Sequence, residues 1–551
     1  MKNNRYLVKV MHFRKNKKEK HDHIVITENV NGEIVNSIIK DPTIKFFMTK
    51  EDYWYNEHDF PVPQKMFVPR EETEEVEHEY KDHFLNLAKL AGSEDWFWST
   101  IKSRDFSSLK TILDDPRFHG ADIHIEDHYT ARYIDHYSQS PDDNLIIAPK
   151  LHKAYWDIEA MTRKAPPGTN IEEWTREASI PIDAISVYSD KEDTMYTFLL
   201  RDPENPLCKE FEDNLEFHKN KCISDLEITD CEIMFFDEEI DLLSTFFHVL
   251  NENLKPDYLS AWNLAFDFKM TYNRIKVLGY EPKDFFCTED MPKKVLYYYE
   301  DKDEWDRAKK SDYATVASSI NYVDQMLIFA ALRATMGKRD SYKLDDILLE
   351  ELGKQKDEVI GNFRTFAMTD YAKYVYYNQK DVFRLHELED QNTETDLIYR
   401  LSNITRTRSQ KAWKKTISLR NLANKFMLDR GFVCSNNHNT TYDGGDNKKF
   451  EGAFVASPDK NDYNGIKIFG SRSNKIYENV CDFDLTSLYP SILLLQMIDP
   501  TNQFGRINIR DENDKDLSPK FIRDFTSGDM IRFGENWLGL PGKDELIELF
   551  S

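Results

Sequence analysis

A strand predicted at residues 153–160 carries two acidic side chains, and this pattern restricts the folds open to the chain. Its sequence is Lys-Ala-Tyr-Trp-Asp-Ile-Glu-Ala, which places Asp157 and Glu159 two positions apart. Because side chains alternate between the faces of a strand, both carboxylates share one face, while Trp156 and Ile158 point into a core on the other. Two adjacent anions repel, and burying them costs free energy unless a cation lies between them. The pattern predicts either a cation site or an edge strand whose polar face meets water.

Strands and helices alternate after residue 151, whereas residues 1–150 mix short strand-like runs with acidic and aromatic stretches. We predict strands at 182–200 (two, around a turn at 189–193), 231–236 and 258–261, and helices at 238–252, 370–406 and 409–429. Such alternation predicts a sheet covered by helices, with ligands at the carboxyl ends of strands. A loop rich in Asn, Asp and Gly at 436–447 marks a domain junction.

Two more segments place acidic side chains where chemistry is possible. Asp267 follows the strand at 258–261 and lies near the start of a helix, a position where a lone Asp more often caps the helix. Tyr377 and Asp381 are four residues apart in a helical pattern and share one face. The second pair could equally be a buried tyrosine beside a surface acid.

The charge balance does not decide the partner. The 551 residues include 98 acidic and 73 basic side chains, for a net charge of −25. A net negative charge opposes binding to the phosphates of a nucleic acid only if the charge is spread evenly over the surface. Instead, acid is concentrated at Glu71–Glu77, which we predict to be a solvated helix face, and basic residues cluster at 14–18 and 406–420.

Cysteine use and apolar patterning predict a cytoplasmic protein. The six cysteines form no CxxC pair, so we expect them to be reduced core residues. The sequence contains no apolar run long enough to span a bilayer and no signal-peptide core after Met1, so we expect no membrane partner.

The order of the three acidic segments resembles the Exo I, Exo II and Exo III motifs of DEDDy-type 3′→5′ exonucleases. The resemblance implies a ribonuclease H-like domain that binds single-stranded DNA 3′ ends. It implies that two divalent cations, Mg²⁺ or Mn²⁺, are held by Asp157, Glu159, Asp267 and Asp381. Tyr377 would orient the attacking water, and Asn263 and Phe266 would contact DNA.

A later segment resembles motif A of the family B DNA polymerases. Residues 481–491 read Cys-Asp-Phe-Asp-Leu-Thr-Ser-Leu-Tyr-Pro-Ser and match the family's DxxSLYPS signature. The resemblance implies that Asp484 is catalytic and binds Mg²⁺ together with the Leu485 carbonyl, once the polymerase site is complete. It also implies that the incoming dNTP contacts Leu485, Ser487, Leu488 and Tyr489, with Tyr489 excluding a 2′-hydroxyl.

Residues 450–455 resemble the family's YxG(G/A) segment, which contacts primer–template DNA through Phe450, Gly452 and Ala453. Phe450 stands where tyrosine is usual, which removes a hydroxyl and keeps the aromatic surface. The fingers pattern K-x-x-x-N-S-x-Y-G and the D-T-D of motif C do not occur in the sequence. The resemblance covers about residues 151–500. Its sequence pattern is most similar to that of the replicative polymerases of tailed phages.

We therefore expect a multidomain α/β chain with three parts. These are a mixed α+β N-terminal domain (1–150), a ribonuclease H-like exonuclease domain (151–405), and a linker with an incomplete polymerase palm carrying motif A (406–551). The expected function is that of an N-terminal part or split subunit of a family B replicative DNA polymerase with a proofreading exonuclease, acting in the cytoplasm of an infected bacterium.

DNA synthesis would then require a second chain that supplies motifs B and C, and a sliding clamp is a further possible partner. Two alternatives remain. One is a free-standing exonuclease with a palm remnant, and the retention of motif A disfavours it. The other is a non-catalytic DNA-binding scaffold, and the complete carboxylate set argues against it.

Overall fold

The structure is a computed structural model, and it describes residues 5–16, 20–54, 67–137, 149–165, 173, 176–334, 339, 341–354 and 364–436. The chain divides into two units, Met1–His438 and Asn439–Ser551, and every described residue lies in the first. The motif A and YxG(G/A) predictions therefore fall outside the described residues. They concern Phe450, Gly452, Ala453, Asp484, Leu485, Ser487, Leu488 and Tyr489.

A six-stranded mixed sheet organises the part of the chain after residue 149. Its strand order is β11-β10-β9-β8-β12-β15. Strand β9 is antiparallel to both of its neighbours, whereas β12 is parallel to β8 and β15, and β10 is parallel to β11. The strands are β8 (Lys153–Ala160), β9 (Ile182–Ser189), β10 (Thr194–Leu200), β11 (Asp230–Phe236), β12 (Tyr258–Ala261) and β15 (Asn321–Asp324). The predicted strands at 153–160, 182–200, 231–236 and 258–261 are confirmed.

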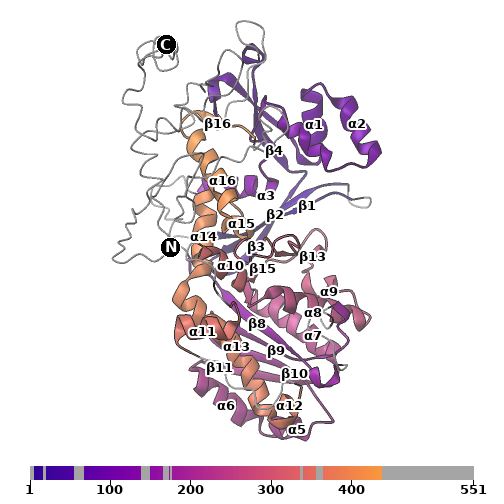
Figure 1. The fold of residues 1–551 in the computed structure, drawn as a ribbon, viewed down its shortest axis with the longest axis vertical. Helices are drawn as coiled ribbons and strands as arrows, with labels where there is room; N and C mark the ends of the chain where they lie inside the picture. Colours follow the sequence, from indigo (N-terminus) through magenta and orange to yellow (C-terminus); the bar gives the residue numbers. More distant parts are fainter. Residues whose placement is uncertain are drawn as a thin grey trace, which may run out of the picture. The chain divides into compact units, whose positions relative to one another are not determined.

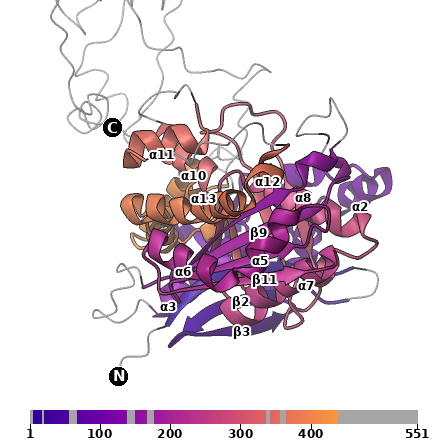
Figure 2. The same cartoon turned by 90° about the horizontal axis from the view of Figure 1, so that it is seen from below.

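Helices cover both faces of this sheet (Figures 1 and 2). One core joins the sheet to α7, α8 and α9, and the other joins it to α5, α6, α11 and α13. These helices are α5 (Pro206–Asp213), α6 (Leu215–Leu226), α7 (Glu239–His248), α8 (Leu264–Val277), α9 (Lys283–Phe286), α11 (Leu344–Leu352) and α13 (Tyr371–Asn392). Smaller elements after β12 are β13 (Leu296–Tyr299), β14 (Tyr313–Val316), α10 (Gln325–Leu332) and α12 (Phe366–Thr369).

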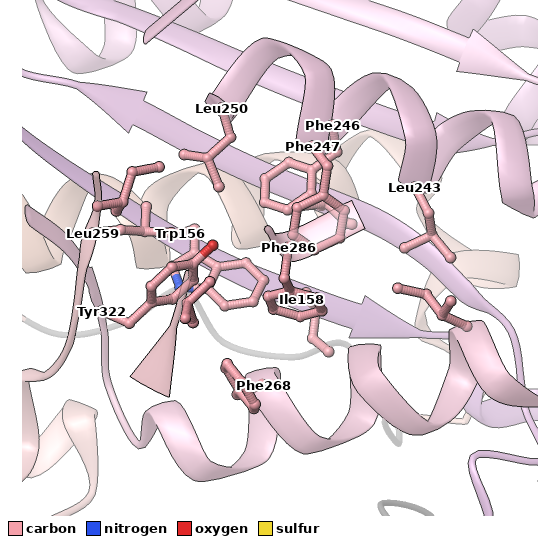
Figure 3. Close-up of a cluster of buried hydrophobic side chains, with 14 of the residues drawn as sticks. Trp156, Ile158, Leu243, Phe246, Phe247, Leu250, Leu259, Phe268, Phe286 and Tyr322 are labelled. Atoms are coloured by element: carbon pink, nitrogen blue, oxygen red, sulfur yellow. The ribbon is translucent and has the colours of Figure 1, made fainter. Parts of the chain in front are cut away.

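Strand β8 lies in the middle of the sheet, between β9 and β12, so the edge-strand interpretation of its acidic face is wrong. Its apolar face is fully buried, as predicted. Trp156 is 0% exposed and stacks on Phe246 of α7, with ring centroids 5.5 Å apart and planes at 17°. Figure 3 shows Trp156 and Ile158 among the aromatic side chains of this core. This burial holds the register of β8 and so fixes where its acidic side chains emerge.

Strands within residues 5–119, together with β16 from residues 432–434, build smaller sheets ordered β1-β2-β3, β6-β4-β7 and β16-β5. Their strands are β1 (Arg5–Phe13), β2 (His23–Val30), β3 (Glu33–Lys40), β4 (Thr43–Thr49), β5 (Phe67–Pro69), β6 (Thr73–Glu79), β7 (Phe118–His119) and β16 (Phe432–Cys434). Their helices are α1 (His83–Leu90), α2 (Glu94–Ser103) and α3 (Ile125–Tyr137).

The prediction of a helix face at Glu71–Glu77 is wrong, because most of this segment lies in strand β6. Strand β6 is the outer strand of its sheet and pairs antiparallel with β4. Lys45 of β4 forms an ion pair of 2.7 Å with Glu75, so the partner strand supplies the counter-charge. Charges on an outer strand also hinder pairing with other chains.

Three predicted helices are interrupted. The region 370–406 consists of α13 and α14 (Glu394–Thr405), separated by Thr393 in the left-handed conformation, with φ of 51°. Helix α7 ends at His248 and continues as a π-helical turn at Val249–Leu254. The region 409–429 is divided into α15 (Ser409–Ala412) and α16 (Lys415–Leu428).

Candidate active site

The carboxylates of Asp157 and Glu159 on strand β8 lie on the face of the sheet that α13 covers. Tyr155, on the same face, packs into the core that contains α13, whereas Trp156 packs into the opposite core. Glu159 is buried, with 8% of its surface exposed, and Asp157 is half-buried. The two acids therefore share one face, as the alternation of the strand predicts.

Helix α8 places Asp267 beside this strand. The helix follows β12 and starts after Asn263, which occupies the N-cap position with φ of 70°. Asp267 is therefore not the cap. Its side chain is 1% exposed, and its Oδ1 atom has no hydrogen-bond partner in the described part of the chain. Phe266 is half-buried at the margin of the α7–α8 core.

An electrostatic interaction links Asp267 to the Asp157 carboxylate. Burial raises the pKa of Asp267 well above its usual range, and the Asp157 carboxylate raises it further. The Ile158 backbone N–H favours the ionised form and opposes this rise. A carboxyl group that is both desolvated and near another carboxylate gains most from a cation.

Helix α13 brings the third predicted segment to the same place, because it packs on β8 and β9. Tyr377 and Asp381 are 9% and 7% exposed, so the interpretation of Asp381 as a surface acid is wrong. Between them, Asn378 is 0% exposed, and its Nδ2 donates a hydrogen bond of 2.9 Å to Asp157 Oδ2. The turn from Tyr377 to Asp381 thus lies against the acidic face of β8.

Two further buried acids next to these residues were not predicted. On β9, Asp183 accepts a hydrogen bond of 2.7 Å from Tyr374 Oη, and burial raises its pKa to about 7. At the end of β15, Asp324 caps α10 by accepting from the Leu327 N–H at 3.1 Å. Burial likewise raises the pKa of Asp324 to about 7.

The sequence does carry a signal for Asp183 and Asp324, because a polar residue inside or at the end of an apolar strand often faces a functional site. Their partners come from other elements, however. The charge of Asp324 contributes to the raised pKa of Asp267, and the charge of Glu159 contributes to that of Tyr374.

Comparisons with known proteins match the region that contains this acidic cluster. Residues 121–347 match the family model described as DNA polymerase family B, exonuclease domain. The chain is also 23% identical over 365 residues to a DNA-directed DNA polymerase of Escherichia phage RB69. The chain carries a family B DNA polymerase exonuclease region. The alignment with the phage polymerase covers 65% of this chain and 36% of the relative, so the chain spans about a third of that protein.

The matched part of the exonuclease region contains Asp157, Glu159 and Asp267, whereas Tyr377 and Asp381 lie beyond it. Among the described residues, no group of three or more His, Cys, Asp or Glu side chains is close enough to hold a metal ion. Asn378 donates a hydrogen bond to Asp157, and the charge of Asp157 acts on the pKa of Asp267. No helix in the described ranges has the length and apolar character needed to cross a membrane.

Proposed function

We propose that this chain is the N-terminal part of a family B replicative DNA polymerase and carries a metal-dependent 3′→5′ proofreading exonuclease. The observation that supports this most is the pair of a half-buried Asp157 on β8 and a buried Asp267 on α8, in which burial and the charge of Asp157 both raise the pKa of Asp267. Folding such a pair costs free energy, so its presence points to a function that uses it.

The fold supports the same proposal. The order β10-β9-β8-β12-β15, with only β9 running against its neighbours, is the arrangement expected of a ribonuclease H-like domain. We assign this domain to residues 151–405, between an N-terminal domain (1–150) and a linker with partial palm (406–551). The acidic groups lie on β8 at the centre of the sheet and on the helices beside it.

The residues fit divalent cations such as Mg²⁺ or Mn²⁺. Every proposed ligand is a carboxylate oxygen donor, the type that these cations prefer. Asp267 Oδ1 is buried without a hydrogen-bond partner in the described ranges, as expected of a ligand atom. Asp157, Glu159, Asp267 and Asp381 would hold the cations.

When bound, the cations would make a coordinated water more acidic and offset negative charge on the leaving oxygen. The protein groups have separate tasks. Tyr377 would orient the water that attacks the terminal phosphodiester, and it can do so as a neutral hydroxyl. Asn263 and Phe266, at the start of α8, would contact the frayed DNA strand end.

The test is the double variant Asp157→Ala/Glu159→Ala. We expect it to lose Mg²⁺-dependent shortening of 5′-labelled single-stranded DNA by at least about a thousandfold, since both proposed ligands are gone. Circular dichroism and thermal unfolding check that the fold is retained. Arg201→Ala/Glu212→Ala, which removes a surface ion pair of 2.6 Å, is a matched control that should leave the activity unchanged. Undiminished nuclease activity in a folded Asp157→Ala/Glu159→Ala variant would remove the site assignment.

The polymerase part of the proposal is supported by motif A and by the similarity to the phage protein, which is a DNA-directed DNA polymerase. Because these 551 residues contain no motif C, Asp484 would need carboxylates from outside them to complete a nucleotidyl-transfer site. Primer extension should therefore appear only when this chain is mixed with a polypeptide that carries motifs B and C. Asp484→Ala should then abolish the extension, and extension by this chain alone would refute the proposal.

A further inference from the structure

Asn378 carries a buried side-chain amide whose nitrogen has a hydrogen-bond partner among the described residues and whose oxygen has none there. Its Nδ2 donates to Asp157 Oδ2 at 2.9 Å, while its Oδ1 has no hydrogen-bond partner in the described part of the chain. The residue is 0% exposed, so surface water does not reach the oxygen. A buried acceptor without a partner destabilises a folded protein.

The orientation of this amide is fixed by its neighbour. An ionised carboxylate only accepts hydrogen bonds, so the NH₂ group of Asn378 must face Asp157. Rotating the amide by half a turn would place its carbonyl oxygen against the carboxylate and lose the hydrogen bond to Asp157. The side chain therefore keeps its hydrogen bond to the half-buried Asp157, and its own carbonyl oxygen stays without a partner in the described part of the chain.

We propose that Asn378 is a positioning residue that holds the Asp157 carboxylate in the orientation required to bind a divalent cation. This inference rests on the proposed function, because it assumes that Asp157 is a metal ligand. Amide donation to one carboxylate oxygen leaves the other oxygen directed elsewhere. Hydrogen-bond partners of this type orient metal ligands, and losing one costs about 10–100-fold in metal affinity.

The chain contains a matched control at the next position. Gln379 is also a buried amide of α13, 1% exposed, and its Oε1 likewise has no partner among the described residues. Its Nε2 donates to Thr197 Oγ1 of β10 at 2.9 Å and to Cys231 Sγ of β11 at 3.9 Å, and neither acceptor is a carboxylate. Replacing either amide by an apolar side chain of similar shape removes one half-satisfied polar group from the same helix.

The experiment measures Mn²⁺ binding to the DNA-free protein by electron paramagnetic resonance, together with the urea midpoint in EDTA. For Asn378→Leu, the Kd for Mn²⁺ should rise at least about tenfold, while the urea midpoint should stay equal or increase. Gln379→Met should leave the Kd unchanged. Asn378→Ala should weaken Mn²⁺ binding as much as Asn378→Leu does but lower the urea midpoint, because it leaves a cavity.

The outcomes separate the two proposals. If the unsubstituted protein binds no Mn²⁺, or if Asp157→Ala binds it equally well, the proposed function fails. If the unsubstituted protein binds Mn²⁺ through Asp157 but both Asn378 variants retain its Kd, the positioning role fails and the proposed function stands. An equal loss of affinity in Gln379→Met would also overturn the inference, because it would trace the effect to helix packing.

Discussion

Replacing Asp267 by asparagine should stabilise the metal-free protein while removing its nuclease activity. The side chain is 1% exposed, its Oδ1 atom has no partner in the described ranges, and Asp157 raises its pKa. Asparagine keeps the shape of the side chain but removes the negative charge. The folded protein then no longer has to bury an ionisable group beside the Asp157 carboxylate.

The expected gain is about 1–3 kcal/mol in the free energy of unfolding at pH 7, the usual cost of an unpaired buried polar group. Its pH dependence follows from the raised pKa of Asp267 in the folded state. Between the unfolded and folded pKa values, the folded state binds more protons, so the stability of the unsubstituted protein falls as pH rises. The advantage of the variant is therefore full above the folded pKa and disappears below about pH 4, where the acid is protonated in both states.

Urea unfolding in EDTA and in excess Mg²⁺ measures both effects. At a Mg²⁺ concentration 100 times its Kd, the unsubstituted protein should gain about 2.7 kcal/mol, whereas Asp267→Asn should gain little. The gap between the two proteins should then close or reverse. Asp345→Asn, at an exposed acid in the first turn of α11, is the control and should cost only a few tenths of a kcal/mol. If Asp267→Asn is no more stable than the unsubstituted protein in EDTA, the argument from electrostatic strain is wrong.

Three further results are expected. Trp156→Ala should lower the free energy of unfolding by about 3–5 kcal/mol in urea titrations, since it removes a fully buried indole from the main core. Arg274→Met should cost about 3–5 kcal/mol, because it leaves the Glu239 carboxylate buried without its 2.6 Å ion pair; a loss below 1 kcal/mol would contradict this. Burial lowers the pKa of His83 to about 4, so stability should fall by roughly 3 kcal/mol as pH drops from 6.5 to 4, and His83→Gln should flatten this dependence.

The strands around the site were predictable because their pattern is local. Residues 153–160 and 258–261 contain enough apolar side chains to identify a strand, and the structure gives the same bounds. The acidic block at Glu71–Glu77 was misassigned because charge density indicates solvent exposure but not periodicity. Its partner Lys45 lies on a separate strand about 30 residues away.

The helix breaks and the supporting polar residues were not predictable in the same way. The break at Thr393 depends on one residue adopting a positive φ, which no strong sequence signal marks. Asn378 and Tyr374 matter because α13 crosses β8 and β9, which brings them to acids 221 and 191 residues earlier in the chain. Contacts of this kind are set by the packing of the helix on the sheet, so a single sequence does not reveal them.

Anomalous scattering from crystals of this chain soaked in Mn²⁺ would locate the cation in the proposed site. We expect an anomalous peak between the carboxylates of Asp157 and Asp267 that is lost in Asp267→Asn. A map without density between these two side chains, at a Mn²⁺ concentration that supports nuclease activity, would contradict this expectation.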